Sequence, residues 1–255
     1  MSNGKGKIAV VTGGSRGLGK SAAMHLAAQG MDVVITYKSA EGEAKSTVDA
    51  IRAAGGRAAA LRLDVSEPES FRDFAAELGG ALRGAFGKEK FDFLVNNAGV
   101  GAHALFAETT PKQFDEMVNV HLKGPFFLTQ GLLPMMNDGG RILNVSSGLT
   151  RFAVPGYSAY AAMKGAVEVL TRYQAKELGA RGITVNTLAP GAIETDFGGG
   201  AVRDNAQLNR FVSENTALGR AGLPDDIGAV VASLLSDDNR WVNAQRVEAS
   251  GGMFV

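Results

Sequence analysis

Tyr160 and Lys164 stand four residues apart in a segment with helical spacing, so their side chains share one face. A free tyrosine has a pKa of about 10 and is a poor base at neutral pH. A neighbouring ammonium favours the phenolate, so we expect Lys164 to lower the pKa of Tyr160. Such a phenol can give a proton to a carbonyl oxygen or take it back from an alcohol. An exposed helical pair without chemistry has the same spacing, so the interpretation needs support from other segments.

Two serines directly follow a strand predicted over 141–145. A hydroxyl at that place can hold a substrate oxygen for proton transfer. Successive strand residues point to opposite faces of a sheet, so only one of Ser146 and Ser147 can reach such a site. The strand pattern alone does not decide which of the two serines faces the site.

A glycine-rich turn follows the first predicted strand, over 8–11, and opens a predicted helix. Glycine permits a tight turn and a close approach of the backbone to a pyrophosphate, and the helix N-terminus supplies N–H groups. The spacing is Gly-x3-Gly-x-Gly, which differs from the common G-x-G-x-x-G. A glycine turn without a ligand is the alternative. We expect dinucleotide phosphates to contact Gly13, Ser15, Arg16, Gly17, Leu18 and Gly19.

The end of the second predicted strand, over 33–36, indicates which dinucleotide binds. In this type of fold an acid at that point bonds the ribose 2′-hydroxyl of NAD. Here the strand is followed by Lys38 and Ser39, and Asp32 stands at its other end. Lys38 and Arg16 can flank a 2′-phosphate and Ser39 can donate to it. We therefore expect NADP, with NAD possible because two glutamates lie nearby and the cations could simply be solvated.

Short β-branched runs alternate with longer amphipathic stretches along the whole chain. Strands are predicted over 8–11, 33–36, 59–63, 93–95, 141–145, 183–187 and 246–248. Helices are predicted over 18–29, 43–54, 69–86, 111–136, 159–178 and 225–235. This alternation predicts an α/β fold of the Rossmann type, a doubly wound parallel sheet with helices on both faces. No linker divides it, so we expect residues 1–255 to form a single domain for cofactor binding and catalysis.

The composition narrows the classes of protein to which the chain can belong. It has no cysteine, which excludes disulfides and thiolate metal sites. Acidic and basic residues number 26 each, without the basic surplus that binds nucleic acid. No apolar run approaches the length of about 20 residues that spans a membrane, and the first residues show no signal region. His25 and His103 lack a second ligand at metal spacing. We expect a cytoplasmic protein without metal, nucleic acid or membrane partners.

Four further segments carry a family resemblance: residues 96–99 (Asn-Asn-Ala-Gly), 144–147 (Asn-Val-Ser-Ser), 160–164 (Tyr-Ala-Ala-Met-Lys) and 190–195 (Pro-Gly-Ala-Ile-Glu-Thr). Together with the glycine turn they follow the order found in short-chain dehydrogenases/reductases. The chain resembles that family from about residue 7 to residue 252. The resemblance is greatest to the branch with 3-oxoacyl-carrier-protein reductases and glucose or other alcohol dehydrogenases.

The resemblance implies roles for individual residues. The family places its serine thirteen residues before the tyrosine, which selects Ser147 over Ser146. Lys164 would bond the nicotinamide ribose, and residues 250–255 would help to form a homotetramer. Further cofactor contacts would come from Asp64 and Val65 at the adenine, Asn97, Ala98 and Gly99 at the ribose, and Pro190, Gly191, Ile193 and Thr195 near the nicotinamide, whose carboxamide the last two would bond.

One position departs from the family pattern, because His121 stands where the family has an asparagine before Leu-Lys-Gly. The asparagine's main-chain carbonyl holds a water that passes protons to the lysine. Asn119 is no replacement, since two residues turn a helix by about 200°. Pro125 has no N–H to occupy the His121 carbonyl four residues back. We therefore predict that His121 takes part in catalysis through its carbonyl, with the imidazole optional.

The sequence thus predicts an NADP-preferring oxidoreductase that transfers a hydride between nicotinamide and a carbonyl or alcohol carbon, as a ketone or 3-oxoacyl reductase. The alternatives are an NAD-linked sugar or alcohol dehydrogenase and a catalytically silent cofactor-binding regulator. Loops over 101–106, 148–156 and 194–215 are expected to form the substrate pocket, the last as a mobile lid. Phe152, Phe197 and Phe211 suggest a substrate with an apolar part.

Overall fold

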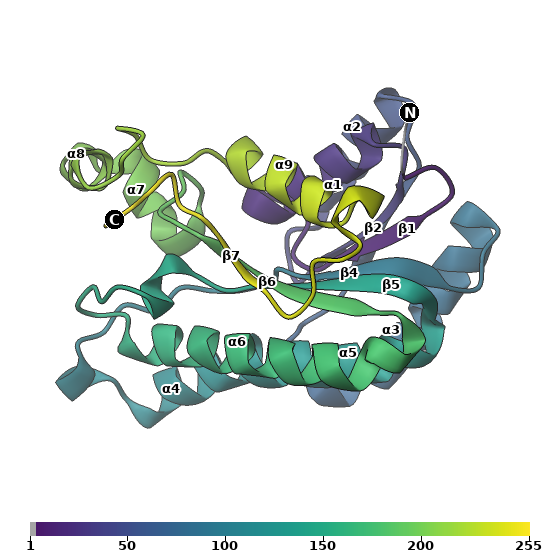
Figure 1. Cartoon of the computed structure of the whole chain (residues 1–255), viewed down its shortest axis with the longest axis horizontal. Helices are drawn as coiled ribbons and strands as arrows, with labels where there is room; N and C mark the ends of the chain where they lie inside the picture. Colours follow the sequence, from purple (N-terminus) through teal and green to yellow (C-terminus); the bar gives the residue numbers. More distant parts are fainter. Residues whose placement is uncertain (1–3) are drawn as a thin grey trace.

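A seven-stranded parallel sheet in the order β3-β2-β1-β4-β5-β6-β7 runs through the centre of the computed structural model, which describes residues 4–255 (Figure 1). Residues 1–3, on which the expectation about a signal region partly rests, lie outside the described residues. The strands are β1 (Ile8–Val11), β2 (Asp32–Tyr37), β3 (Ala58–Arg62), β4 (Phe91–Asn96), β5 (Met136–Val145), β6 (Thr184–Pro190) and β7 (Arg246–Ala249).

Helices cover both faces of the sheet, with α1, α2 and α9 on one side and α3 to α6 on the other (Figure 1). Their bounds are α1 Gly17–Ala28, α2 Glu41–Ala53, α3 Phe71–Ala81, α4 Pro111–Val118, α5 Gly124–Leu132, α6 Ser158–Leu178, α7 Ala201–Asp204, α8 Ala206–Glu214 and α9 Pro224–Leu234. Every side chain of β1 is buried, because parallel strands have helices on both faces. The two apolar cores lie above and below the sheet. The predicted doubly wound α/β fold is confirmed.

Strand order reverses at β1, which pairs with β2 on one side and β4 on the other. The carboxyl ends of parallel strands meet along one edge, and a crevice forms where the order reverses. The glycine turn follows β1 and residues 97–99 follow β4, so the predicted cofactor segments meet at this point.

The structure corrects the helix predicted over 111–136. It divides into α4, a π-helical turn over Asn119–Lys123 and α5, and Met136 already belongs to β5. In the π turn the N–H of Gly124 reaches the carbonyl of Asn119, five residues back. The predicted lid over 194–215 contains the short helices α7 and α8, whose brevity explains the weak periodicity of that segment.

Within residues 4–255, no helix combines the length and apolarity needed to cross a membrane. The same residues hold no group of three histidine, cysteine, aspartate or glutamate side chains arranged to bind a metal ion.

Candidate active site

The structure brings together Ser147, Tyr160 and Lys164 beyond the carboxyl end of β5. Ser147 caps the 3-10 helix Gly148–Thr150, and its Oγ accepts the N–H of Leu149 at 3.2 Å. Tyr160 lies in the first turn of α6, with its phenol close enough to the Ser147 side chain to influence its pKa. Lys164 follows one turn later, with its Nζ 5.5 Å from the centre of the Tyr160 ring. The three groups can therefore act on one substrate oxygen.

Burial decides the protonation of Tyr160. Removal from water raises the pKa of its phenol, and the nearby Ser147 side chain only partly opposes this rise. The expectation that Lys164 would lower this pKa is wrong for this structure, because the desolvation of the phenol dominates. At neutral pH Tyr160 is thus a protonated phenol, which is the form that donates a proton to a carbonyl oxygen.

Lys164 is equally buried, and its ammonium donates to the carbonyl of Val145 at 2.7 Å. Burial lowers the pKa of Lys164 to about 8. The lysine therefore carries a charge at neutral pH and loses it in mildly alkaline solution.

The hydroxyl of Ser146 faces the main chain of α6, 3.3 Å from the carbonyl of Lys164. It donates to the carboxylate of Glu168 at 2.7 Å, and Glu168 lies one turn beyond Lys164 on α6. This geometry fits the selection of Ser147 over Ser146.

His121 lies in the π turn and is 1% exposed, with its ring edge-on to Tyr160 at 5.0 Å. Its Nε2 is 2.8 Å from the carbonyl of Val100, which fits a donating Nε2–H. Its buried Nδ1 has no partner among residues 4–255. Burial, and then the charge of Lys164, lower the pKa of His121 to about 3. The imidazole is therefore neutral at physiological pH and has no acidic proton to transfer to a substrate.

The glycine turn has the shape of a phosphate cradle. Gly13 and Gly17 adopt positive φ angles of 67° and 54°, which favour glycine. A Cβ at Gly13 would come within 3.0 Å of Ala98, and one at Gly19 would collide with the Gly13 carbonyl. This close backbone packing leaves the N–H groups at the start of α1 open to an anion, so the residues fit a dinucleotide.

The other predicted cofactor residues lie around the same crevice. Asn97 holds the turn in place, because its Nδ2 donates to the carbonyl of Thr12 at 2.8 Å. Thr195 lies beside Gly17, since a Cβ on that glycine would be 3.6 Å from the threonine. The remainder lie in the turn before α1 or its first residues, or at and after the ends of β3, β4 and β6: Ser15, Leu18, Val65, Ala98, Gly99, Pro190, Gly191 and Ile193.

A cavity of about 270 Å³ lies beyond the end of β2 and is lined by Tyr37, Lys38, Ser39, Glu41 and Arg62. Lys38 bonds Asp64 at 2.6 Å. Burial works to raise the pKa of Asp64, but hydrogen bonds from Lys38 and Ser66 hold it below its usual range. Two cations and the Ser39 hydroxyl therefore face this space together with the single carboxylate of Glu41, and this excess of positive charge suits a phosphate.

Arg62 is a member of this cavity that sequence reasoning missed. It ends β3 next to Tyr37, and its Nε donates to the carbonyl of Lys38 at 3.3 Å. Arg62 has no carboxylate partner among residues 4–255, whereas Arg16 lies 3.9 Å from Asp196. Only the pairing of β3 with β2 brings Arg62 to this place, so no local signal marked it.

Aromatic side chains lie along the open side of the site. The Phe197 ring is 5.8 Å from Tyr160 and 44% exposed. Phe152 packs at 4.8 Å against Phe254, which lies 6.2 Å from Phe211. Of the three phenylalanines singled out in the sequence, Phe197 thus lies beside Tyr160, and the other two each pack against Phe254 in the C-terminal tail.

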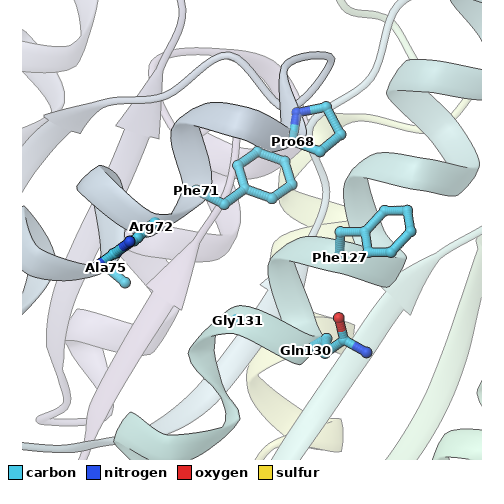
Figure 2. Close-up of a pocket in the computed structure, with 7 residues that line it drawn as sticks. All are labelled: Pro68, Phe71, Arg72, Ala75, Phe127, Gln130 and Gly131. Carbon is cyan, nitrogen blue, oxygen red and sulfur yellow. The ribbon is translucent and has the colours of Figure 1, made fainter.

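A separate cavity of about 340 Å³ lies between α3 and α5, lined by Phe71, Arg72 and Ala75 on one side and Phe127, Gln130 and Gly131 on the other (Figure 2). None of the predicted site residues lines it. The cavity is therefore distinct from the crevice at the strand ends.

Comparison with known proteins finds reductases of the same fold. Residues 13–254 match the family model described as enoyl-(acyl carrier protein) reductase. Tetrahydroxynaphthalene reductase PfmaG of Pestalotiopsis fici is 34% identical, over 97% of this chain and 91% of that protein. The promiscuous reductase LugOII, which catalyses keto-reduction at C1 during lugdunomycin biosynthesis, superposes with a TM-score of 0.94 at 40% identity, covering 98% and 99% of the two chains. Landomycin C-6 ketoreductase LanV, solved with NADP and rabelomycin, gives 0.89 at 39% identity, covering 98% and 97%.

Proposed function

Since this chain belongs to the short-chain dehydrogenase/reductase family, we propose which ketones it reduces. It is an NADP-preferring oxidoreductase acting on ketones. We propose that its substrates carry the ketone on a fused aromatic ring system. The observation that carries the proposal is the exposed ring of Phe197, 5.8 Å from the buried Tyr160. A flat aromatic substrate can stack on Phe197 while its ketone oxygen reaches the phenol. The naphthalene substrate in the name of the relative PfmaG supports the same class.

In the proposed reaction each residue of the site has one task. Tyr160 donates its phenolic proton to the ketone oxygen, and the hydroxyl of Ser147 holds that oxygen. Lys164 places its charge beside the phenol. When bound, NADPH supplies the hydride that reduces the carbonyl carbon. The glycine turn, Lys38, Ser39 and Arg62 would hold its phosphates, and Asn97, Ile193 and Thr195 would lie at its nicotinamide half.

A panel of substrates tests the proposed class. With NADPH, we expect a bicyclic aryl ketone such as a tetralone to show a kcat/KM about 2- to 12-fold above that of an acyclic 3-oxoacyl thioester. An aromatic stacking pair contributes about 0.5–1.5 kcal/mol beyond the burial of its surface. Phe197→Ala should remove most of this advantage. Phe126→Ala is the control, because Phe126 is similarly exposed on α5.

Other results would favour other functions. Equal kcat/KM for the two ketones, or a preference for the thioester, would contradict the aromatic class and support a 3-oxoacyl reductase. Faster oxidation of a sugar or alcohol with NAD would support the dehydrogenase alternative. Tight NADPH binding without turnover of any ketone would support the silent regulator.

We also propose that the main chain of His121, and not its imidazole, serves the proton supply of Lys164. Pro125 cannot donate to the His121 carbonyl. The neutrality of the buried imidazole speaks against its acting as an acid at physiological pH. A water bound to the His121 carbonyl would pass protons towards the lysine.

His121→Asn and His121→Ala are therefore expected to keep kcat within about tenfold of the wild-type value. Thermal unfolding should be measured alongside, because the alanine variant loses the bond to Val100 and leaves a small cavity. A fall of kcat beyond about 10²-fold in both variants, with the fold intact, would show that the imidazole is a catalytic group.

We further propose that residues 1–255 act as one domain in a cytoplasmic homotetramer. The exposed side chains of Leu218, Trp241 and Val255 support self-association, because large apolar groups at a surface favour contacts between subunits. Analytical ultracentrifugation tests the assembly, and a monomer at micromolar concentration would contradict it. Fractionation of cells that express a tagged chain tests the location.

A further inference from the structure

Glu168 occupies a place that the proposed chemistry leaves unexplained. It lies on α6 one turn beyond Lys164 and two turns beyond Tyr160, and its side chain is 16% exposed. One of its oxygens, Oε1, accepts from three donors: Ser146 Oγ at 2.7 Å, Thr150 Oγ1 at 2.7 Å and Arg246 Nε at 2.8 Å. The carboxylate thus joins the helix of the catalytic tyrosine to the residues on either side of Ser147.

Arg246 holds this carboxylate from the opposite side. It comes from β7, and its NH1 donates to Glu248 Oε2 at 2.8 Å. Its NH2 lies 3.1 Å from Thr150 Oγ1 and 3.4 Å from the carbonyl of Ser147. Thr150 Oγ1 is itself 2.9 Å from that carbonyl, and its single proton is shared between the carbonyl and Glu168. The backbone of Ser147 is therefore held between a helix, a 3-10 turn and the last strand of the sheet.

We propose that Glu168, oriented by Arg246, is a positioning residue that fixes the Ser147 hydroxyl relative to Tyr160. This inference rests on the proposed function, in which those two groups bind the ketone oxygen. Ser147 follows β5 while Tyr160 belongs to α6, so their separation depends on how the turn after β5 is attached to the helix. Glu168 contributes to that attachment through Ser146 and Thr150, in addition to the bond from Lys164 to the Val145 carbonyl. A displacement of about 1 Å at a reacting group can cost about 10²-fold in rate.

Glu168→Ala is therefore expected to lower kcat about tenfold while leaving the Kd of NADPH within about twofold, because a partial displacement of Ser147 weakens only the hold on the ketone oxygen. Glu168→Gln keeps an acceptor oxygen and should recover most of the lost rate. Glu177→Ala is the matched control, an exposed glutamate later on the same helix, and should leave kcat unchanged.

A double-mutant cycle separates positioning from general stability. In a Ser147→Ala background, Glu168→Ala should lower kcat by less than about twofold, since its target is already gone. The same tenfold loss in both backgrounds, or a wild-type kcat for Glu168→Ala, would overturn the proposal.

Amide exchange gives a readout that does not depend on turnover. The N–H of Leu149 donates to Ser147 Oγ, so Glu168→Ala should speed exchange in the peptide around residues 147–152 of the NADPH-bound protein, and Glu177→Ala should not. Unchanged exchange would overturn the positioning role. A wild-type protein that reduces no ketone would instead overturn the proposed function, and the exchange result would still decide the role of Glu168.

Discussion

Tyr160→Phe is expected to lower the turnover of any accepted ketone by about 10²–10⁴-fold, the usual contribution of a positioned proton donor. The substitution removes only the phenolic oxygen, so the ring contacts with His121 and Phe197 remain. Because burial keeps the phenol protonated at neutral pH, the variant loses the proton itself and not merely a hydrogen bond. Steady-state kinetics at saturating NADPH, with Kd measured by fluorescence titration, would separate this loss from weaker cofactor binding.

Tyr173→Phe is the matched control for this experiment, since Tyr173 is 64% exposed on the same helix. It should retain wild-type kcat. A turnover of Tyr160→Phe within a few-fold of wild type would refute the role of Tyr160 as the proton donor.

NADPH is expected to bind about 5- to 30-fold more tightly than NADH, which corresponds to about 1–2 kcal/mol. A shielded charge-assisted hydrogen bond contributes about 1.5–3 kcal/mol. Lys38 is 66% exposed and already paired with Asp64, so its net contribution is at the lower end. Arg62 faces the same cavity and has no carboxylate partner among residues 4–255. We therefore expect both cations to contribute to the preference.

Lys38→Ala and Arg62→Ala should each reduce the ratio of the two dissociation constants by weakening NADPH binding, with NADH binding nearly unchanged. Lys45→Ala provides the control, because that lysine is exposed on the neighbouring helix α2. Titration of both cofactors by fluorescence or calorimetry gives the ratio directly. Tighter binding of NADH than NADPH by the wild-type protein would contradict the assignment of the cavity to a 2′-phosphate.

The sequence by itself determined the class of fold, because a doubly wound sheet requires patterns that are local. Buried parallel strands such as β1 are continuous apolar runs, and glycines mark the turn where the backbone bends tightly. The pair Tyr160 and Lys164 was equally visible, since the helix period alone places residues four apart on one face. The helix boundaries at the π turn were not visible in the sequence. No simple pattern of residues marks the place where the N–H of Gly124 bonds the carbonyl of Asn119, five residues back.

Only the tertiary structure decided how these groups behave. The pKa of Tyr160 depends on the burial of its phenol, which no spacing of residues reveals, and burial reversed the direction expected from the adjacent lysine. Arg62 reached the cavity through the pairing of β3 with β2, and Arg246 reached Glu168 from β7 at the other end of the sheet. Contacts of this kind join elements that are distant in sequence. They form only when the sheet is assembled, so local sequence patterns do not predict them.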